Sequence, residues 1–410
     1  MKNLASLSPQ IRQYMVVTGN YWAFTLTDGA LRMLVVLHFH SLGYSPLEIA
    51  SLFLFYEFFG VVTNLVGGYL GARLGLNRTM NLGLVLQVVA LMMLFVPADW
   101  LTVVWVMAAQ ALSGIAKDLN KMSAKSAIKQ LIPNDQQGAL YRWVALLTGS
   151  KNALKGVGFF LGGALLTWVG FQHAVLTMAI ALSLVWLSSL VLLKKDLGKT
   201  KAKPKFSEML SKSRAVNVLS AARLFLFAAR DVWFVVALPV YLSSQLNWDF
   251  WKVGGFLALW IIGYGAVQTL APTMTGFRSG RVPDGRTAFG WAMALAAFPA
   301  LIALSMGTEI PVEVVLIGGL LAFGVLFAVN SSLHSYLIVS YAREEGASLD
   351  VGFYYMSNAG GRLFGTLLSG WIYQAYGLEV CLWVSTAFVT LAAVISVALP
   401  RHPEPTVAQA

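Results

Sequence analysis

The chain has 410 residues, of which 58% are hydrophobic and only 11% are charged. Soluble domains carry roughly a quarter of charged residues, so this composition excludes an ordinary soluble protein. The formal net charge is +11, but the basic residues lie in alternate loops and inside apolar segments, so we expect no nucleic-acid partner. Cys381 is the only cysteine, which excludes an intrachain disulfide and a thiolate metal site.

Apolar segments long enough to cross a bilayer follow one another through the whole chain. They predict an all-α membrane protein with twelve transmembrane helices. In chain order these helices are expected at 15–39, 46–71, 78–97, 101–130, 142–168, 173–193, 216–243, 250–275, 286–306, 311–341, 351–375 and 379–399. The first residues, 1–12, are polar, so we expect no cleavable signal peptide.

The distribution of Lys and Arg between the loops predicts the orientation. The connections at 40–46, 97–100, 170–173, 307–312 and 376–379 contain neither residue, whereas the opposite connections contain many. By the positive-inside rule the basic side faces the cytoplasm, and both termini lie on it. We therefore expect a multi-pass protein of a bacterial inner membrane with cytoplasmic termini.

The two halves of the chain repeat one another. Four residues of the fifth predicted helix recur in the eleventh at a constant offset of 207, and they pair Lys155, Gly158, Gly163 and Gly170 with Arg362, Gly365, Gly370 and Gly377. This register predicts two pseudo-symmetric six-helix halves, 1–193 and 216–400. A basic cytoplasmic linker at 194–215 is expected between them, and a cytoplasmic tail at 401–410 after them.

The loop after the second predicted helix, 68–78 (GYLGARLGLNR), resembles the loop signature of major facilitator transporters. This resemblance implies the fold just described and a gating role for Arg73 and Arg78. Ala72 departs from the family pattern, which has an Asp there that pairs with charge across the halves. The eleventh helix begins near the cytoplasmic mouth with Tyr354 and Tyr355, which are also expected to gate it.

Three further runs resemble ArsJ-type organoarsenical efflux permeases: 20–32 (NYWAFTLTDGALR), 113–125 (SGIAKDLNKMSAK) and 148–156 (TGSKNALKG). The resemblance covers nearly the whole chain. It implies export of 1-arseno-3-phosphoglycerate and hence arsenate resistance. It also implies a functional link to glyceraldehyde-3-phosphate dehydrogenase, which makes that compound when arsenate replaces phosphate.

Charged residues near the middle of apolar segments are the main functional signal. A charge at the bilayer centre costs about 2.5–3.5 kcal/mol, so such residues normally face a bundle interior or a wet cavity. The first helix places Tyr21, Asp28 and Arg32 on one stripe, where Asp28 either pairs with Arg32 or serves transport. The fourth helix carries Lys117 and Lys121, whose mutual repulsion favours contact with an anionic cargo.

The repeat places Lys155 and Arg362 in matching positions of the two halves. We expect them to form a clamp for a doubly charged anion, because Arg binds oxyanions bidentately and Lys supplies a mobile charge. In the seventh helix Arg230 is assigned to cargo and Asp231 to a basic residue or a proton, since adjacent helical residues do not face each other.

Several other polar residues in the predicted helices have two possible roles. Glu57 is either a proton carrier, because burial disfavours its charged form, or a structural partner of a basic residue in the fourth or eleventh helix. Asp118 is expected to pair with the second helix or with a neighbouring basic residue. The amides of Asn120 and Asn330 are expected to bind cargo hydroxyls or to bond backbone across helices.

Together these features predict a secondary active exporter of an anionic substrate, not an enzyme. The chain has no Walker motif to bind ATP, and no cofactor is expected. The remaining alternatives are an organic-phosphate or carboxylate exchanger and, from another class, a transporter-like membrane sensor. The expected partners are the small anion and the lipid bilayer, and the protein is expected to act as a monomer.

Overall fold

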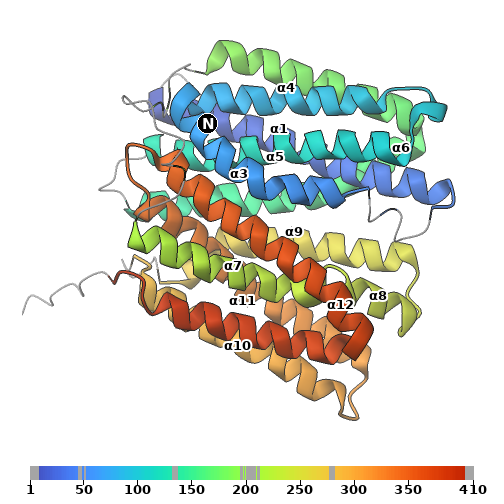
Figure 1. The fold of residues 1–410 in the computed structure, drawn as a ribbon, viewed down its shortest axis with the longest axis vertical. Helices are drawn as coiled ribbons and strands as arrows, with labels where there is room; N and C mark the ends of the chain where they lie inside the picture. The colour runs from blue at the N-terminus through green and yellow to red at the C-terminus, as the bar shows by residue number, and fades with distance from the viewer. Residues whose placement is uncertain are drawn as a thin grey trace, which may run out of the picture.

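A computed structural model describes residues 9–44, 49, 52–131, 137–193, 197, 199, 209, 213–276 and 282–401. The helices of this part of the chain form one bundle (Figure 1). In order they are α1 (Pro9–Ser41), α3 (Leu54–Leu74), α4 (Leu76–Leu94), α5 (Val103–Leu131), α6 (Gln137–Leu192), α7 (Arg214–Phe234), α8 (Ala237–Ser244), α9 (Phe250–Met274), α10 (Gly285–Met306), α11 (Val312–Tyr341) and α12 (Ala347–Ser396), with a short 3₁₀ turn at Ala98–Trp100.

The expected fold class, two six-helix halves, is confirmed by this arrangement. Two elements each contain two membrane spans, because α6 and α12 run through a sharp bend at Gly170 and Gly377. Both glycines have a positive φ, 74° and 83°, which a side chain would strain. The bend falls at the same register in each half, so each pair of spans folds back as a hairpin.

The seventh predicted helix, expected at 216–243, is interrupted in the structure. It forms α7 and α8, which are separated by Val235 and Val236. Pro239 has no backbone N–H and cannot donate to the carbonyl of Val235 four residues earlier, which weakens the helix at this point. The break lies where this span meets the wall of the central cavity.

Some expected boundaries lie outside the described residues. The start expected for the second helix at 46 falls among undescribed positions, and the described helix α3 begins at Leu54. Most of the basic linker at 194–215 and residues 402–410 of the tail are also outside them.

The two halves lie side by side. Figure 1 shows α1 to α6 in blue to green above α7 to α12 in yellow-green to red. The halves meet mainly where α3 packs on α12 and where α6 packs on α9. The chain enters α1 and leaves α12 at the same end of the bundle, at the left of Figure 1, which we call the terminal side.

Close backbone contacts set the depth of the repeated residues. A Cβ on Gly158 would lie 2.6 Å from the carbonyl oxygen of Leu26 in α1, and one on Gly365 would lie 2.7 Å from that of Ala228 in α7. Only glycine permits these approaches. Each glycine lies three residues after the repeated cation of its own helix, so Lys155 and Arg362 enter the bundle at equivalent depths.

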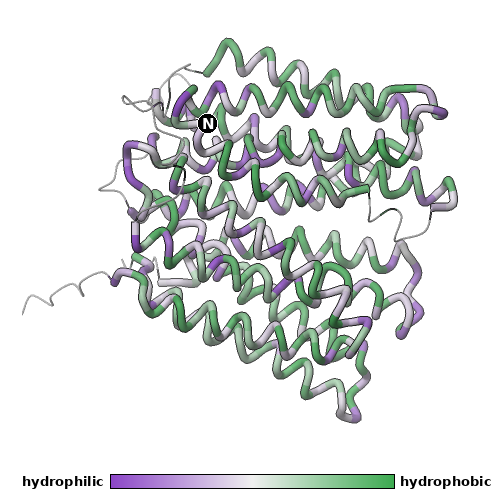
Figure 2. The backbone as a smooth tube through the Cα atoms, in the orientation of Figure 1, coloured by the Kyte–Doolittle hydropathy of each residue, from purple (hydrophilic) through white to green (hydrophobic). Residues whose placement is uncertain are grey.

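Membrane insertion is supported by length and composition. Among the described residues, seven helical segments are long and apolar enough to cross a membrane, and two of these are the long hairpins α6 and α12. Figure 2 shows hydrophobic residues along most of the bundle and hydrophilic ones concentrated at its ends and in its interior. The other long helices, α1, α3 and α5, carry many of the interior charges.

Candidate functional site

A cavity of about 940 Å³ lies between the two halves. Its walls come from α1, α3, α5 and α6 in the first half and from α7, α9, α11 and α12 in the second. Exposed side chains such as Trp251 and Thr167 line the end away from the termini, so the cavity opens there. The described part of the chain is therefore open on the side opposite the termini.

The terminal side is closed by contacts between the halves. Gln137 accepts hydrogen bonds from the hydroxyls of Tyr336 at 3.0 Å and Ser340 at 3.2 Å. The Lys129 ammonium donates to the carbonyl of Ser340 at 3.2 Å, and the ring of Tyr141 lies 4.7 Å from that of Tyr336. These contacts join neutral groups and one lysine of the first half to α11 of the second.

The residues expected to gate this side occupy different places. Arg73 donates to the hydroxyl of Tyr69 at 2.8 Å within its own helix, and both Arg73 and Arg78 are exposed on the surface. Tyr355 lines the cavity, whereas Tyr354 is fully buried behind it. Of these four, only Tyr355 touches the space that a cargo would occupy.

Glu57 is the centre of an ion network in the middle of the cavity. Its Oε1 lies 3.0 Å from Arg362 Nη2 and 3.3 Å from Arg32 Nη2, and its Oε2 lies 3.9 Å from Lys117 Nζ. The pair with Arg362 joins the two halves. Three cations thus stabilise the charged carboxylate, and two of them, Lys117 and Arg362, come from the helices expected to supply a structural partner.

Asp231 forms a second node of this network in the other half. Its Oδ2 lies 3.2 Å from Arg362 Nε, which is the basic partner expected for it. Its Oδ1 lies 2.5 Å from Arg230 Nε. The expectation that Arg230 and Asp231 do not meet is therefore wrong, because the long arginine side chain curls back to its neighbour.

The acids of α1 and α5 have partners on α3 and on α5 itself. Asp28 accepts a hydrogen bond from the Tyr56 hydroxyl at 2.7 Å rather than pairing with Arg32, which is bound to Glu57. Asp118 lies 2.6 Å from the ammonium of Lys121 and 4.0 Å from that of Lys117 on its own helix. Helix geometry alone did not predict that Arg32 would turn towards α3.

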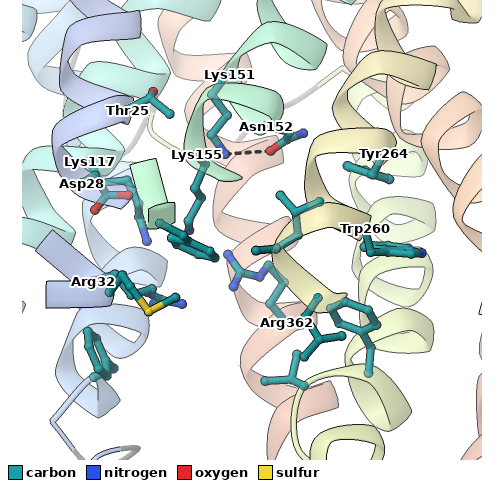
Figure 3. Close-up of a pocket in the computed structure, with 18 of the residues that line it drawn as sticks. Thr25, Asp28, Arg32, Lys117, Lys151, Asn152, Lys155, Trp260, Tyr264 and Arg362 are labelled. Atoms are coloured by element: carbon teal, nitrogen blue, oxygen red, sulfur yellow. Dashed lines mark hydrogen bonds between the residues drawn. The ribbon is translucent and has the colours of Figure 1, made fainter. Parts of the chain in front are cut away.

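Lys155 and Arg362 reach into the same space from opposite halves (Figure 3). Lys155 has no carboxylate partner among the described residues, whereas Arg362 has two. One turn closer to the terminal side, Lys151 donates to Asn152 at 3.3 Å, and Asn152 donates in turn to Gln268 of α9. This places Lys151 in the cavity as well, although it was not assigned to the cargo.

Two further cations were also missed. Lys125 and Arg223 line the end of the cavity nearest the terminal side, and each is only 3% exposed. The ammonium of Lys125 bonds to Thr148 in the cavity wall. The regular spacing of Lys117, Lys121 and Lys125 on one helix face was the signal that should have placed it here.

Two predicted cargo ligands lie outside the cavity. Asn120 donates to the carbonyl of Ala116 at 2.9 Å and packs against Gly83 of α4. Asn330 donates to the carbonyl of Trp291 in α10 at 2.8 Å. Both amides are fully buried, and only the bond of Asn330 reaches a neighbouring helix, so neither touches the cavity in this structure. Tyr21 does line the cavity, and its hydroxyl has no partner there.

Aromatic rings form much of the wall in the second half. The guanidinium of Arg223 lies 3.9 Å from the ring centre of Phe227, and that of Arg230 lies 4.9 Å from the same ring. Trp260 and Tyr264 stack at 5.4 Å beside them. Cation–π contact of this kind stabilises an arginine without neutralising its charge.

Positive charge exceeds negative charge in the cavity. Its described lining contains nine cations: Arg32, Lys117, Lys121, Lys125, Lys151, Lys155, Arg223, Arg230 and Arg362. Four carboxylates line the cavity or pair with these cations: Asp28, Glu57, Asp118 and Asp231. Among the described residues no cluster of three His, Cys, Asp or Glu side chains could hold a metal ion.

Comparisons with known proteins give the fold and the family. The fold is similar to the human organic anion transporter MFSD10 (TETRAN), with a TM-score of 0.74 and 16% identity over 95% of this chain and 100% of that one. It is also similar to a bacterial homologue of the iron transporter ferroportin in an outward-facing state, with a TM-score of 0.70 and 18% identity over 95% and 99% of the two chains.

The E. coli fucose:proton symporter FucP is a further similar structure, with a TM-score of 0.71 and 12% identity over 95% of this chain and 98% of that one. A search of curated proteins finds no match. The family model of the Major Facilitator Superfamily matches residues 17–281, more than half of the chain. The chain thus belongs to the Major Facilitator Superfamily, whose members are transporters rather than enzymes.

Proposed function

We propose that this chain is a secondary active exporter of a multiply charged organic anion, and that the anion is 1-arseno-3-phosphoglycerate. In this proposal it is a monomer of a bacterial inner membrane with both termini in the cytoplasm, and it confers arsenate resistance. The cavity opening opposite the termini then faces outward. Glyceraldehyde-3-phosphate dehydrogenase supplies the cargo on the cytoplasmic side.

The observation that carries the proposal is the excess of cations over carboxylates in the cavity. Buried charges without partners are costly, so nine basic side chains beside four carboxylates favour a negatively charged occupant. Lysines and arginines bind oxyanions through charge-assisted hydrogen bonds. A cargo with two or more acidic groups fits this balance better than a sugar or a cation.

The chemistry of the lining also bears on the form of arsenic. Trivalent arsenic prefers thiolates, and the only cysteine, Cys381, is buried away from the cavity lining. A pentavalent arsenate ester is a hard oxyanion of nearly phosphate shape, which lysines and arginines bind well. The same likeness of shape leaves an organic-phosphate exchanger as the second candidate function.

Transport into everted membrane vesicles tests the proposal. Vesicles with and without the protein are incubated with arsenate, glyceraldehyde 3-phosphate and the dehydrogenase system, and arsenic retained inside is measured. We expect arsenic to accumulate only with the protein and only when all three components are present. An exposed cation that does not line the cavity, Lys252, gives the matched control Lys252→Gln, which should transport normally.

Other outcomes separate the alternatives. Accumulation of labelled 3-phosphoglycerate without arsenic would replace the arsenical exporter by an organic-phosphate exchanger. Failure to accumulate any anion, by a protein shown to be folded and inserted, would favour the membrane sensor.

A further inference from the structure

Three cations at the end of the cavity nearest the terminal side stand apart from the rest. We call Lys125, Lys151 and Arg223 the floor cluster. All three line the cavity, and none forms an ion pair with a carboxylate of the described residues. The cations in the middle of the cavity differ, because most of them pair with Glu57, Asp118 or Asp231.

The hydrogen bonds of the floor cluster leave donors for a ligand. Arg223 donates from Nε to Asn358 Oδ1 at 2.8 Å and from Nη1 to the carbonyl of Ser331 at 3.2 Å, so Nη2 is left. Lys125 bonds to Thr148, and Lys151 has a single bond to Asn152. An ammonium has three donors, so each lysine keeps at least one for an anion.

The positions of these charges make an empty floor unfavourable. The charges of Lys151 and Arg223 act repulsively on Lys125. Lys125 and Arg223 are almost completely buried, so water screens this repulsion poorly. A group with two negative charges and several acceptor oxygens would satisfy all three cations at once.

We propose that the floor cluster is an oxyanion subsite for the phosphoryl dianion of the cargo, and that it binds inorganic phosphate by itself. The subsite joins the halves, because Lys125 and Lys151 come from the first half and Arg223 from the second. The other acidic group of the cargo then lies towards Arg32 and Arg362, where it competes with Glu57. This inference rests on the proposed function, since it places one end of that cargo.

Phosphate binding to the purified full chain in lipid nanodiscs tests the subsite. Calorimetric titration uses inorganic phosphate, 3-phosphoglycerate and glycerate, which lacks the phosphoryl group. We expect wild type to bind the first two and to bind glycerate more weakly. Lys151→Met and Arg223→Gln should each weaken phosphate binding about tenfold or more, as expected for loss of a charged hydrogen-bond partner.

Two variants guard against loss of structure. Lys151→Arg keeps the charge and should retain phosphate binding, and Lys252→Gln, on the exposed surface, should match wild type. Without phosphate, Lys151→Met should raise the melting temperature, because it removes a repelled cation, and phosphate should no longer raise it further. A residue that merely supports the fold would lower the melting temperature instead.

The inference is overturned if the floor variants bind phosphate as wild type does while Arg362→Gln loses it, or if chloride binds as tightly as phosphate. These results are independent of arsenic transport. Phosphate binding at the floor without arsenic export would refute only the proposed function. Arsenic export by a protein whose floor variants bind phosphate normally would refute only the subsite.

Discussion

The two halves of this transporter share a backbone pattern but present different chemistry to the cavity. The first half supplies lysines, together with Arg32, and most of the carboxylates. The second half supplies arginines, and two of them lie against aromatic rings. A lysine is a mobile point charge, whereas an arginine held on a ring has a fixed orientation. Aromatic support is common to both halves, because Arg32 and Lys117 lie 4.9 Å and 3.7 Å from the ring centre of Tyr56, so the halves differ in the kind of cation they present.

The equivalent glycine contacts make this difference informative. Gly158 and Gly365 bring Lys155 and Arg362 to the same depth, yet in the described part of the chain Lys155 has no carboxylate partner and Arg362 has two. The repeat therefore determines the depth of a residue along the membrane normal. The ion-pair partners of equivalent residues still differ between the two halves. Variants that remove these cations or their neighbours test whether the two halves contribute differently to cargo binding.

The largest effect is expected from removing the matched pair itself. Lys155→Met and Arg362→Gln should each reduce transport by about 100-fold or more, since each removes a charge that would bind the cargo across the halves. Initial uptake rates in everted vesicles measure the loss, with surface expression as the control. Wild-type rates in both variants would contradict the clamp.

A smaller loss is expected from the aromatic support. Phe227→Leu keeps most of the volume but removes the ring beside Arg223 and Arg230, and cargo affinity should fall about five- to tenfold. Phe388, which packs with Phe225 and Phe364 outside the cavity lining, gives the control Phe388→Leu. Equal affinities in both variants would mean that the rings only fill space.

Glu57→Gln should change affinity by only a few-fold, and in the opposite direction. The carboxylate competes with cargo for Arg32, Lys117 and Arg362, so its neutral form should bind the anion more tightly. Binding titration measures the gain. Exchange that persists in the variant but no longer responds to an imposed pH gradient would instead make Glu57 the proton carrier.

The smallest effect is a shift in melting temperature. An anionic ligand that binds only the folded protein stabilises it by mass action, so saturating 3-phosphoglycerate should raise the midpoint by on the order of a few degrees. The shift should be larger at low salt, where the cavity charges are less screened. A shift with a cationic drug and none with organic phosphates would reverse the class of substrate.

Much of the fold was accessible from the sequence because the bilayer constrains it so strongly. Spans must be apolar and about 20 residues long, and this located most of the long helices that the described residues form. The bends at Gly170 and Gly377 lie in the short connections that the hydrophobic pattern predicts between consecutive helices. The break at Val235 and Val236 was missed, because it interrupts a single apolar run near Pro239.

The pairing of the site residues was less accessible. Spacing along one helix placed Arg32, Lys117 and Lys155 on inward faces, but the contacts of Glu57 come from three other helices. Such contacts depend on which helices pack together, and the spacing of residues along one helix does not give this information. The position of Asn120 was not predicted for the same reason, since α4 covers the face it occupies and it does not line the cavity.

The surplus of fixed positive charge has a consequence for the energetics of transport across a polarised membrane. An anion carried without a compensating cation moves net charge, and each elementary charge gains about 2.3 kcal/mol for every 100 mV when it leaves an inside-negative cell. The excess cations belong to the protein and balance the charge of a dianion inside the cavity. They do not leave with it, so the net charge moved in each cycle is that of the cargo. The resting voltage would then drive such a cargo outward, and currents in reconstituted planar bilayers would report its valence.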